Sequence, residues 1–288
     1  MAKVTLALKP QRTNQVISLD NVGWLPWTWA LALSIVTLTV AYALRKSSKS
    51  LKTSDLLMQV TLMLLLYAAW QYVGSLSVGG VENADSAGMW IADFQASLGW
   101  PSEQSIQRSA MNAPWLILFA DLYYMLAHVP VFLITLAWVL FARRDDWPFA
   151  RTTVVLLTGM CLLLQFKPVA PPRLLPELGI VDTAITNGRS VYGAIAGANE
   201  LSAMPSVHIA WSAAVALLII VIAQTPWRWL ALIYPLLTLW VVVVTGNHFI
   251  LDGVVAVVLL AVAVTVTMSI PSQRPQRWKA KNDSSNLV

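Results

Sequence analysis

Three histidines, His128, His208 and His248, carry the clearest chemical signal in this sequence. Two of them, His208 and His248, lie in short polar interruptions between long apolar runs, beside groups that could act with an imidazole. An imidazole serves as acid, base or nucleophile near neutral pH. The two motifs therefore predict proton-transfer or nucleophilic chemistry at the ends of apolar helices.

The segment Gly246–Asp252 (GNHFILD) places a carboxylate four residues after His248. On a helix, residues four apart lie on one face. Asp252 could therefore hold one imidazole nitrogen and leave the other free as base or nucleophile. Taken alone, this pair fits equally well an interfacial histidine that caps a helix beside an acidic residue at the membrane boundary.

The segment Ala203–His208 (AMPSVH) contains a helix-start pattern. Pro205 suits the first turn of the helix that follows. The unpaired amides at such a start favour a phosphate, Ser206 adds a hydroxyl donor, and His208 stands in the same turn as a proton donor. A Pro-Ser helix start alone is more often structural than functional.

The segment Lys167–Pro176 (KPVAPPRLLP) contains four prolines and is predicted to be stiff and non-helical. Arg173 carries a guanidinium whose fork matches phosphate oxygens. Lys167 could add a second positive charge or simply extend from a helix end to the interface. Together the three segments predict a phosphoryl-transfer site. No paired carboxylates and no Cys/His cluster occur at ligand spacing, so neither a metal nor another cofactor is expected.

The composition predicts a membrane environment for these motifs. Of 288 residues, 57% are apolar and 11% are charged, and the mean hydropathy is +0.65. These values exclude an ordinary soluble domain and predict an all-α, polytopic membrane bundle. The net charge of +5 comes from basic residues in short loops, which favours a role in topology over nucleic-acid binding. The single cysteine, Cys161, excludes internal disulfides.

About seven segments are long and apolar enough to span a membrane as helices. They are Trp24–Leu44, Leu56–Leu76, Pro114–Phe141, Thr152–Phe166, Ser206–Gln224, Trp227–Thr245 and Phe249–Ile270. The chain is accordingly divided into a polar N-terminal segment (1–23), an additional transmembrane helix (24–44), a catalytic membrane domain (56–270) and a basic tail (271–288).

Basic residues predict the orientation. They gather after the first helix, after the third helix and in the tail, which places these segments on the cytoplasmic side. The loop 77–113 is acidic and lies outside, so the histidine motifs face the extracytoplasmic side of a multi-pass cytoplasmic membrane protein. Within that loop, Met89–Ala110 predicts two short interfacial helices separated near Gly99 and Pro101. They could form a lid or a ramp for lipids, or only surface packing.

The order of Arg173, Pro-Ser-x-His and His-x-x-x-Asp resembles the type 2 phosphatidic acid phosphatase superfamily over Leu56–Ile270. This resemblance implies a six-helix core plus one N-terminal helix. Five residues separate Lys167 from Arg173 where the family has six, and Leu174 replaces the usual Pro after Arg173.

Two further departures concern the second and third motifs. Val207 replaces the usual Gly before His208, and Val241 and Val242 occupy the region of the expected third-motif Arg. These changes, the segment PVAPPRLLP and the pattern Tyr124-x-x-x-His128-x-Pro130 resemble bacterial members of the branch that contains inositol phosphorylceramide synthase and sphingomyelin synthase.

By this resemblance, His248 would attack phosphorus to form a phosphohistidine, Asp252 would orient it, and His208 would protonate the leaving alkoxide. Ser206, Arg173 and Lys167 would bind the phosphate. Candidates for contacts to the substrate or to these residues are His128, Tyr124, Asp121 and Glu200. His128, deep in the third helix, could instead be a buried histidine bonded to a neighbouring helix.

The expected function is therefore cleavage of a membrane lipid phosphoester or phospho-head-group at the outer membrane face. Water as acceptor would make the protein a phosphatase, and an alcohol such as inositol would make it a phosphotransferase. The alternatives from another class are a transporter and a catalytically inactive lipid-binding protein. The sequence does not define an oligomeric state.

Overall fold

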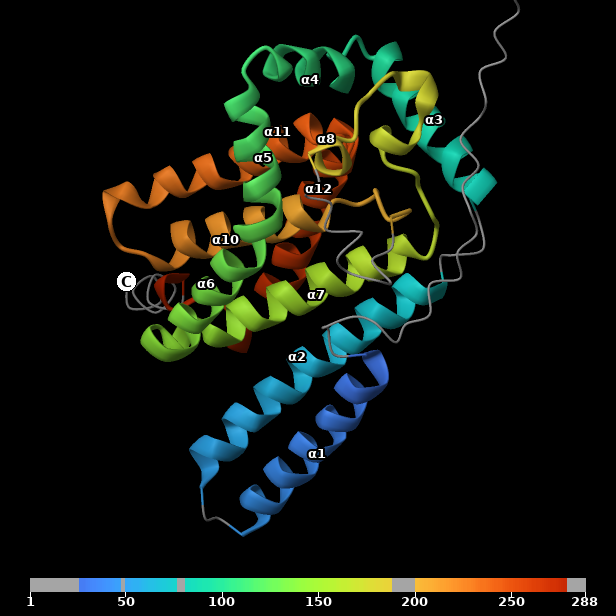
Figure 1. Cartoon of the computed structure of the whole chain (residues 1–288). Coiled ribbons are helices and arrows are strands. Elements are labelled where there is room, and N and C mark those ends of the chain that lie inside the picture. Colours follow the sequence, from blue (N-terminus) through green and yellow to red (C-terminus); the bar gives the residue numbers. More distant parts are fainter. Residues whose placement is uncertain (1–25, 48–49, 77–80, 188–199, 279–288) are drawn as a thin grey trace, which may run out of the picture.

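A computed structural model describes residues 26–47, 50–76, 81–187 and 200–278. These ranges form an all-α bundle (Figure 1). They contain no β-strand, only an isolated bridge between Val169 and Ser202. The all-α polytopic class predicted from the sequence is therefore confirmed. The polar N-terminal segment (1–23) and the end of the tail (279–288) lie outside the described residues.

Eight helices of the described residues follow the apolar segments of the sequence. They are α1 (Trp27–Lys46), α2 (Leu51–Leu76), α5 (Pro114–Leu126), α6 (His128–Ala142), α7 (Trp147–Gln165), α10 (Val207–Ile222), α11 (Ile233–Val244) and α12 (Ile250–Ser269). Five helices are long and apolar enough to cross a membrane, and a bent pair makes up to six; α10 is a shorter apolar helix. Apolar residues form helices here because a helix satisfies every backbone polar group internally.

The third predicted span is broken. The sequence predicts one helix over Pro114–Phe141, but α5 and α6 meet at Ala127 with a bend of 47°. Pro130 accounts for the break, because proline lacks an amide hydrogen and its ring clashes with the carbonyl of residue 126, four positions earlier. The bend brings His128 to the start of α6 instead of the middle of a continuous helix.

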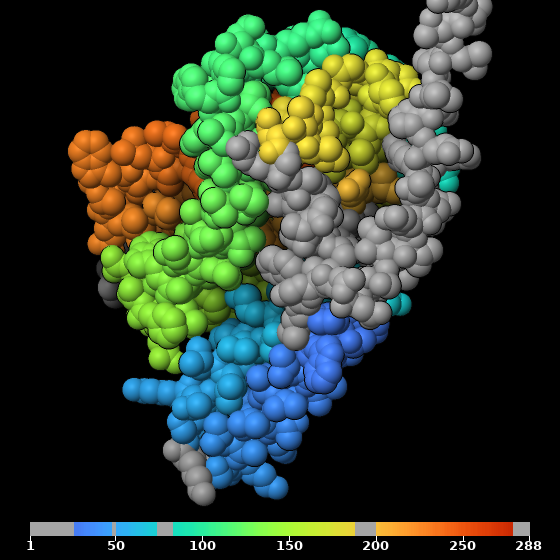
Figure 2. Space-filling view, viewed as in Figure 1, coloured from blue at the N-terminus to red at the C-terminus, as the bar shows by residue number. Residues whose placement is uncertain are grey.

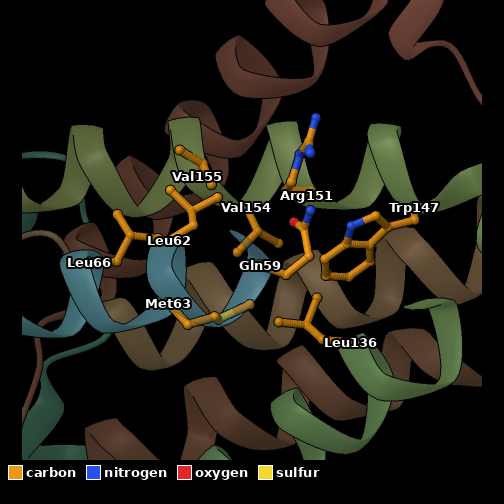
Figure 3. A pocket seen from close by; sticks show the side chains of 9 residues that line it. All are labelled: Gln59, Leu62, Met63, Leu66, Leu136, Trp147, Arg151, Val154 and Val155. Carbon is orange, nitrogen blue, oxygen red and sulfur yellow. The ribbon is translucent and has the colours of Figure 1, made fainter. Parts of the chain in front are cut away.

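Helices α1 and α2 form a hairpin that projects from the remaining helices (Figure 1), and α2 joins it to the bundle by packing on α7. A small pocket lies between α2 and α7 (Figure 3). Its lining includes Gln59 of α2 and Trp147 and Arg151 of α7, and most other lining residues are apolar. None of the three histidines lines this pocket, so it is separate from the histidine motifs.

The predicted basic segments share one end of the bundle. The amide of Gln276, in the tail, donates to Oδ1 of Asp146 at the α6–α7 connection (2.8 Å). Gln59, in the first half of α2, lines the same pocket as Trp147 and Arg151 near the start of α7, so both helices start at this end. This arrangement agrees with the prediction that the three segments lie on one side.

The opposite end is covered by α3 (Val81–Ser97), α4 (Glu103–Met111) and α8 (Thr183–Thr186). In Figures 1 and 2, α4 and the segment 170–187 lie next to one another there. Two helices were predicted over Met89–Ala110; α3 begins earlier, at Val81, and Gly99 has a φ of +69° between the two helices.

The proline-rich segment between α7 and α8 crosses the same end as two 3₁₀ turns, η4 (Pro172–Leu174) and η5 (Pro176–Leu178). The amide of Val169 donates to the Leu201 carbonyl (2.7 Å), and the amide of Ala203 donates to the Val169 carbonyl (3.1 Å). A few residues on, the amide of Arg173 donates to the carbonyl of Gly246 (2.9 Å). The segment is therefore tied to the chain before α10 and to the loop between α11 and α12.

The core beneath these segments is built by α7, α10, α11 and α12. Buried residues from all four helices form one cluster: Leu157, Cys161, Ile209, Ala210, Ala214, Val242, Ala256, Leu260 and Ala263. Small residues in α10 and α12 allow the helices to approach closely, as in other membrane bundles.

Gly246 generates a stability prediction. Its φ is +70°, and an added Cβ would lie 2.8 Å from Cγ2 of Ile180 and 3.0 Å from Cβ of Arg173. We expect Gly246→Ala to lower the free energy of unfolding by about 1–3 kcal/mol, because it combines a left-handed backbone with this close approach. Thermal unfolding in detergent would measure the change.

The matched control is Gly159→Ala in α7, where an added Cβ meets nothing within 4 Å. Alanine is the better helix former, so this variant should be neutral or slightly more stable. Equal melting temperatures for the two variants would contradict the structural requirement for glycine at position 246.

Candidate active site

His248 lies in the loop between α11 and α12, two residues before α12 begins. The prediction that one helix carries both His248 and Asp252 is therefore wrong in detail. Asp252 is the third residue of α12, and its Oδ2 accepts a hydrogen bond from the amide of Phe249, the N-cap residue (2.8 Å). This capping turn, and not a shared helix, brings Oδ2 to 3.3 Å from Nδ1 of His248.

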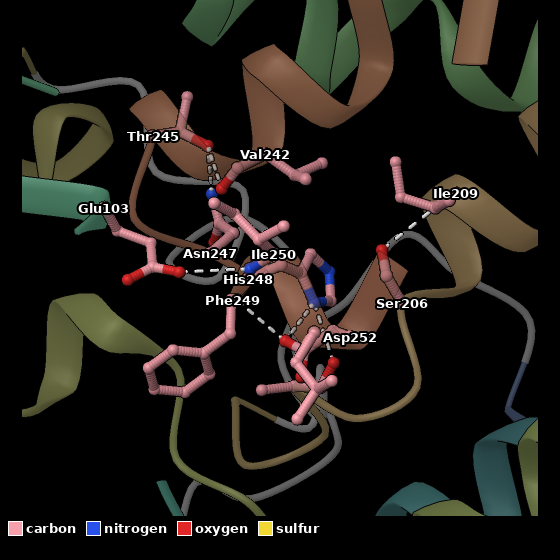
Figure 4. A network of polar contacts seen from close by, with 12 residues as sticks. Glu103, Ser206, Ile209, Val242, Thr245, Asn247, His248, Phe249, Ile250 and Asp252 are labelled. Atoms are coloured by element: carbon pink, nitrogen blue, oxygen red, sulfur yellow. Dashed lines mark hydrogen bonds and ion pairs between the residues drawn. The ribbon is translucent and has the colours of Figure 1, made fainter. Parts of the chain in front are cut away.

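The hydrogen bonds of His248 define its tautomer. Nδ1 lies 2.7 Å from the carbonyl oxygen of Ala203 and 3.3 Å from Oδ2 of Asp252 (Figure 4). Because a carbonyl oxygen can only accept, Nδ1 carries the hydrogen, and in the neutral ring Nε2 keeps a free lone pair. The ring is 5% exposed and Asp252 is fully buried. His248 thus presents an oriented nucleophile or base.

The pKa of His248 is lowered from its ordinary value of 6.5 to about 4. Burial is the largest cause, since it disfavours the charged ring; the hydrogen bond to the Ala203 carbonyl raises the pKa, and the positive charge of Arg173 lowers it. The amide of Arg173 donates to the carbonyl of Gly246, two residues before His248, so Arg173 is held beside this loop. At neutral pH the ring is neutral, as a nucleophile must be.

His208, the second residue of α10, lies next to His248. Their ring centroids are 5.6 Å apart in an edge-to-face arrangement. Tyr124 stacks on His208 from α5, with a centroid separation of 4.5 Å. The structure therefore brings together the two histidines that the sequence motifs singled out.

His128 lies next to His208, so the three histidine rings follow one another in the order His248, His208 and His128. Its ring centroid lies 4.5 Å from that of His208, and its ring stacks on Trp211 at 5.4 Å. It is 6% exposed, and neither ring nitrogen has a hydrogen-bond partner among the described residues. Among the described residues, His128 therefore contacts the neighbouring helix α10 through the rings of His208 and Trp211 and not through a hydrogen bond.

Ser206 is the N-cap of α10, and its Oγ accepts from the amide of Ile209 (3.3 Å). Pro205 was predicted in the first turn of this helix, but the helix begins at Val207 and Pro205 lies one residue before the N-cap. The hydroxyl of Ser206 still has a hydrogen to donate. The amide of Ser206 donates to the carbonyl of Asp252 (3.3 Å), which ties the starts of α10 and α12 together.

Arg173 is buried in η4, with 2% of its side chain exposed. Its Nε lies 3.0 Å from Oδ2 of Asp182, and Oδ1 of Asp182 accepts from the amide of Ile185 (2.9 Å). The capping aspartate of α8 therefore orients the guanidinium. Asp182 is a functional candidate that the sequence motifs did not indicate.

The remaining candidates are placed differently. Asp121 is buried and accepts hydrogen bonds from Oγ1 of Thr183 (2.7 Å) and Nδ2 of Asn187 (3.1 Å), so it anchors α8 to α5. Lys167 and Glu200 are both exposed, and neither side chain makes a hydrogen bond or ion pair with a described residue. The structure thus does not bring Lys167 into contact with Arg173 or Ser206.

Two polar residues of the outer helices also reach this site. Oε1 of Glu103 accepts from the amide of Ile250 (3.1 Å), and Oε1 of Gln95 accepts from the amide of Leu251 (2.7 Å). Sequence reasoning treated Glu103 only as part of an acidic loop. The feature of the sequence that could have indicated its role was the spacing of Glu103 and Gln107, two polar residues one turn apart in a short helix.

The arrangement combines a neutral imidazole nucleophile, a second imidazole beside it, a buried guanidinium and a hydroxyl at a helix start. Such a set can bind a phosphate, attack its phosphorus and move a proton to or from an oxygen. Among the described residues, no group of three or more His, Cys, Asp or Glu side chains is placed to hold a metal ion. Metal independence stays a prediction.

No curated protein and no solved structure matches this chain. The family model of the PAP2 superfamily matches residues 89–266, more than half of the chain. The matched span begins in α3 and ends in α12, and it contains all three histidines, Arg173, Ser206 and Asp252. It starts later than the resemblance over Leu56–Ile270, so α2 lies outside it together with α1. The chain therefore belongs to the PAP2 superfamily.

Proposed function

We propose that this protein cleaves a lipid phosphoester through a phosphohistidine formed on His248. Membership of the PAP2 superfamily supports a phosphatase-type lipid phosphoesterase. The observation that carries the finer mechanism is the occupation of Nδ1 of His248 by the Ala203 carbonyl and Asp252, which leaves Nε2 as the free nitrogen.

In the first half-reaction, the Nε2 lone pair forms a bond to phosphorus while the bond from phosphorus to the lipid alkoxide breaks. Protonated His208 gives its proton to the leaving oxygen, and Asp252 balances the positive charge that develops on His248. In the second half-reaction, His208 takes a proton from the incoming hydroxyl, whose oxygen attacks phosphorus. The bond from phosphorus to nitrogen breaks and His248 is restored.

The phosphate oxygens need positive charge and hydrogen-bond donors while this happens. Arg173 supplies a buried guanidinium held by Asp182, and Ser206 supplies a hydroxyl at the start of α10. The described geometry gives no support to Lys167 as a third phosphate ligand, because its side chain is exposed and contacts neither residue.

The acceptor decides between hydrolysis and transfer. The sequence resembles the branch of lipid head-group transferases, and His128 and Tyr124 place two polar rings beside His208, where an acceptor hydroxyl would be activated. We therefore extend the proposal to transfer onto a small polar alcohol such as inositol, in competition with water. The distribution of basic residues supports a site at the extracytoplasmic face of the cytoplasmic membrane.

A trapping experiment tests the nucleophile. Purified protein in detergent with chelator, given a phosphate-labelled lipid and quenched in alkali, should carry label that is stable to base and labile to acid, as phosphohistidine is. We expect His248→Ala to lose this label and at least about 10³-fold in turnover. Label retained in His248→Ala, or turnover abolished by chelator in the wild type, would contradict the mechanism.

The role of His208 is tested with the leaving group. His208→Ala should slow release of an alkoxide by about 10²–10⁴-fold, because the leaving oxygen then departs without a proton. An acidic leaving group such as 4-nitrophenolate needs no proton, so the same variant should lose far less activity on 4-nitrophenyl phosphate. An equal loss on both substrates would contradict the assignment of His208 as the acid.

The pH profile tests the environment of His248. Charged or titratable groups near it are Arg173 from η4, His208 from α10, Asp252 from α12 and, beyond Ile250, Glu103 from α4. For a phosphodiester lipid, whose charge stays constant over the range scanned, we expect the acid limb of kcat/KM to lie near pH 4, where His248 takes a proton.

Removal of a nearby positive charge should make that proton easier to add. Arg173→Gln should therefore move the acid limb of kcat/KM to higher pH, besides weakening phosphate binding. Arg108→Gln, which changes an exposed arginine on α4, is the control. An acid limb near 6.5 in the wild type, or no shift in Arg173→Gln, would show that His248 is not held neutral in this way.

Hydrolysis and transfer are separated by the products. Incubation of a labelled lipid phosphate with inositol should yield labelled inositol phosphate in addition to free phosphate, whereas incubation without inositol should yield labelled free phosphate alone. Production of free phosphate alone across a panel of alcohols would restrict the protein to phosphatase activity.

A further inference from the structure

The start of α12, which carries Asp252, takes its caps from distant parts of the chain. The first amides of a helix have no partner within it. Asp252 itself accepts from Phe249, Glu103 of α4 accepts from Ile250, and Gln95 of α3 accepts from Leu251. Figure 4 shows Glu103 reaching the α12 start from the side opposite Ser206. Two of the three amides therefore depend on side chains roughly 150 residues away.

Glu103 and Gln95 are also bonded to one another. Nε2 of Gln95 donates to the same Oε1 of Glu103 that accepts from Ile250 (2.7 Å). Gln95 is 3% exposed and Glu103 is 4% exposed. A buried polar group that loses its hydrogen-bond partner costs more free energy than the bond itself contributes to stability. Any movement that breaks this network is therefore unfavourable, and the network fixes the relative position of α3, α4 and α12.

Gln107, one turn after Glu103, makes a second set of bonds. Its Nε2 donates to the carbonyls of Val181 and Val244 (both 2.8 Å), and its Oε1 accepts from the amide of Val181 (2.8 Å). Val244 ends α11, and Val181 directly precedes Asp182, the partner of Arg173. Gln107 is 1% exposed.

We propose that Gln95, Glu103 and Gln107 form an outer clamp whose function is to position the reacting groups. Glu103 and Gln95 hold the turn that brings Asp252 to His248, and Gln107 holds the segment that brings Asp182 to Arg173. The three are positioning residues that act through these neighbours. The inference rests on the proposed function. It gives the helices over Met89–Ala110 a positioning role, which differs from both alternatives considered from the sequence, a lid or lipid ramp and surface packing alone.

The clamp predicts different effects for its two arms. Glu103→Leu removes an acceptor from Ile250 and from Gln95, so the His248–Asp252 turn should shift and kcat should fall about 10–100-fold at little changed KM. Gln107→Leu frees the Asp182 segment, so Arg173 should bind phosphate less well and KM should rise by a similar factor. Glu103→Gln keeps an oxygen acceptor at the same position and should retain most of the activity.

The control is Arg108→Gln, an exposed position between the two clamp residues of α4. Kinetic constants are expressed per folded protein, with the folded fraction taken from melting curves in detergent. A clamp that only stabilises the fold would lower the melting temperature and leave kcat and KM unchanged. That result in Glu103→Leu and Gln107→Leu would overturn the proposal.

Hydrogen exchange of the Ile250 and Leu251 amides tests the clamp independently of catalytic activity. Both amides should be protected in the wild type and in Arg108→Gln, and should exchange at least about 10-fold faster in Glu103→Leu. A wild-type protein that turns over no lipid phosphate would refute the proposed function and the catalytic purpose of the clamp together. Unchanged exchange in Glu103→Leu would refute the clamp even where the wild type is active.

Discussion

The hydrogen bond from Nδ1 of His248 to the carbonyl oxygen of Ala203 is the contact on which the site depends. It is shorter than the contact to Asp252 (2.7 Å against 3.3 Å), and its acceptor cannot change protonation state. A carboxylate alone would hold either tautomer, because it can accept a proton. The backbone carbonyl excludes that ambiguity, so Nε2 stays the nitrogen with the lone pair.

The position of that carbonyl depends on the proline-rich segment. Val169 bonds to Leu201 and Ala203 on one side, and four residues later Arg173 bonds to Gly246 on the other. Prolines restrict the backbone between these two points, so the distance between them varies little. The same short segment therefore places the acceptor of His248 and the guanidinium for phosphate. This explains how three motifs that are far apart in sequence can act as one site.

The sequence predicted the elements of this protein better than the contacts between them. Apolar length located the helices, and residue chemistry selected His208, His248, Asp252, Arg173 and Ser206, because both signals are local. The bend at Ala127 was missed although Pro130 was visible, since proline-containing apolar runs can also continue as kinked helices. The roles of Ala203, Gln95 and Glu103 could not be predicted, because each bonds to a partner far away in sequence and one side of each bond is a backbone group. Asp182 is only nine residues from Arg173, but their pairing depends on how the proline-rich segment turns between them.

The polar residues of α3 and α4 lie at helix ends because hydrocarbon offers no hydrogen-bond partners there. In hydrocarbon an unsatisfied backbone group costs several kcal/mol, so polar partners are needed wherever a helix ends. Helices α11 and α12 are joined by a short loop, so the carboxyl end of one lies beside the amino end of the other. Those two ends need opposite partners: a donor for the free carbonyls of α11 and acceptors for the free amides of α12.

Helix α4 meets both needs with two residues one turn apart. Glu103 can only accept and lies at the positive end of the α12 dipole, whereas Gln107 has a donor for the carbonyl of Val244 at the end of α11. Glutamate at position 107 would place an acceptor against that carbonyl, whereas glutamine at position 103 would still offer an oxygen to the amide of Ile250. The donor at position 107 is thus fixed by the polarity of the helix end that it covers, and the loop that carries His248 lies directly between the ends of α11 and α12.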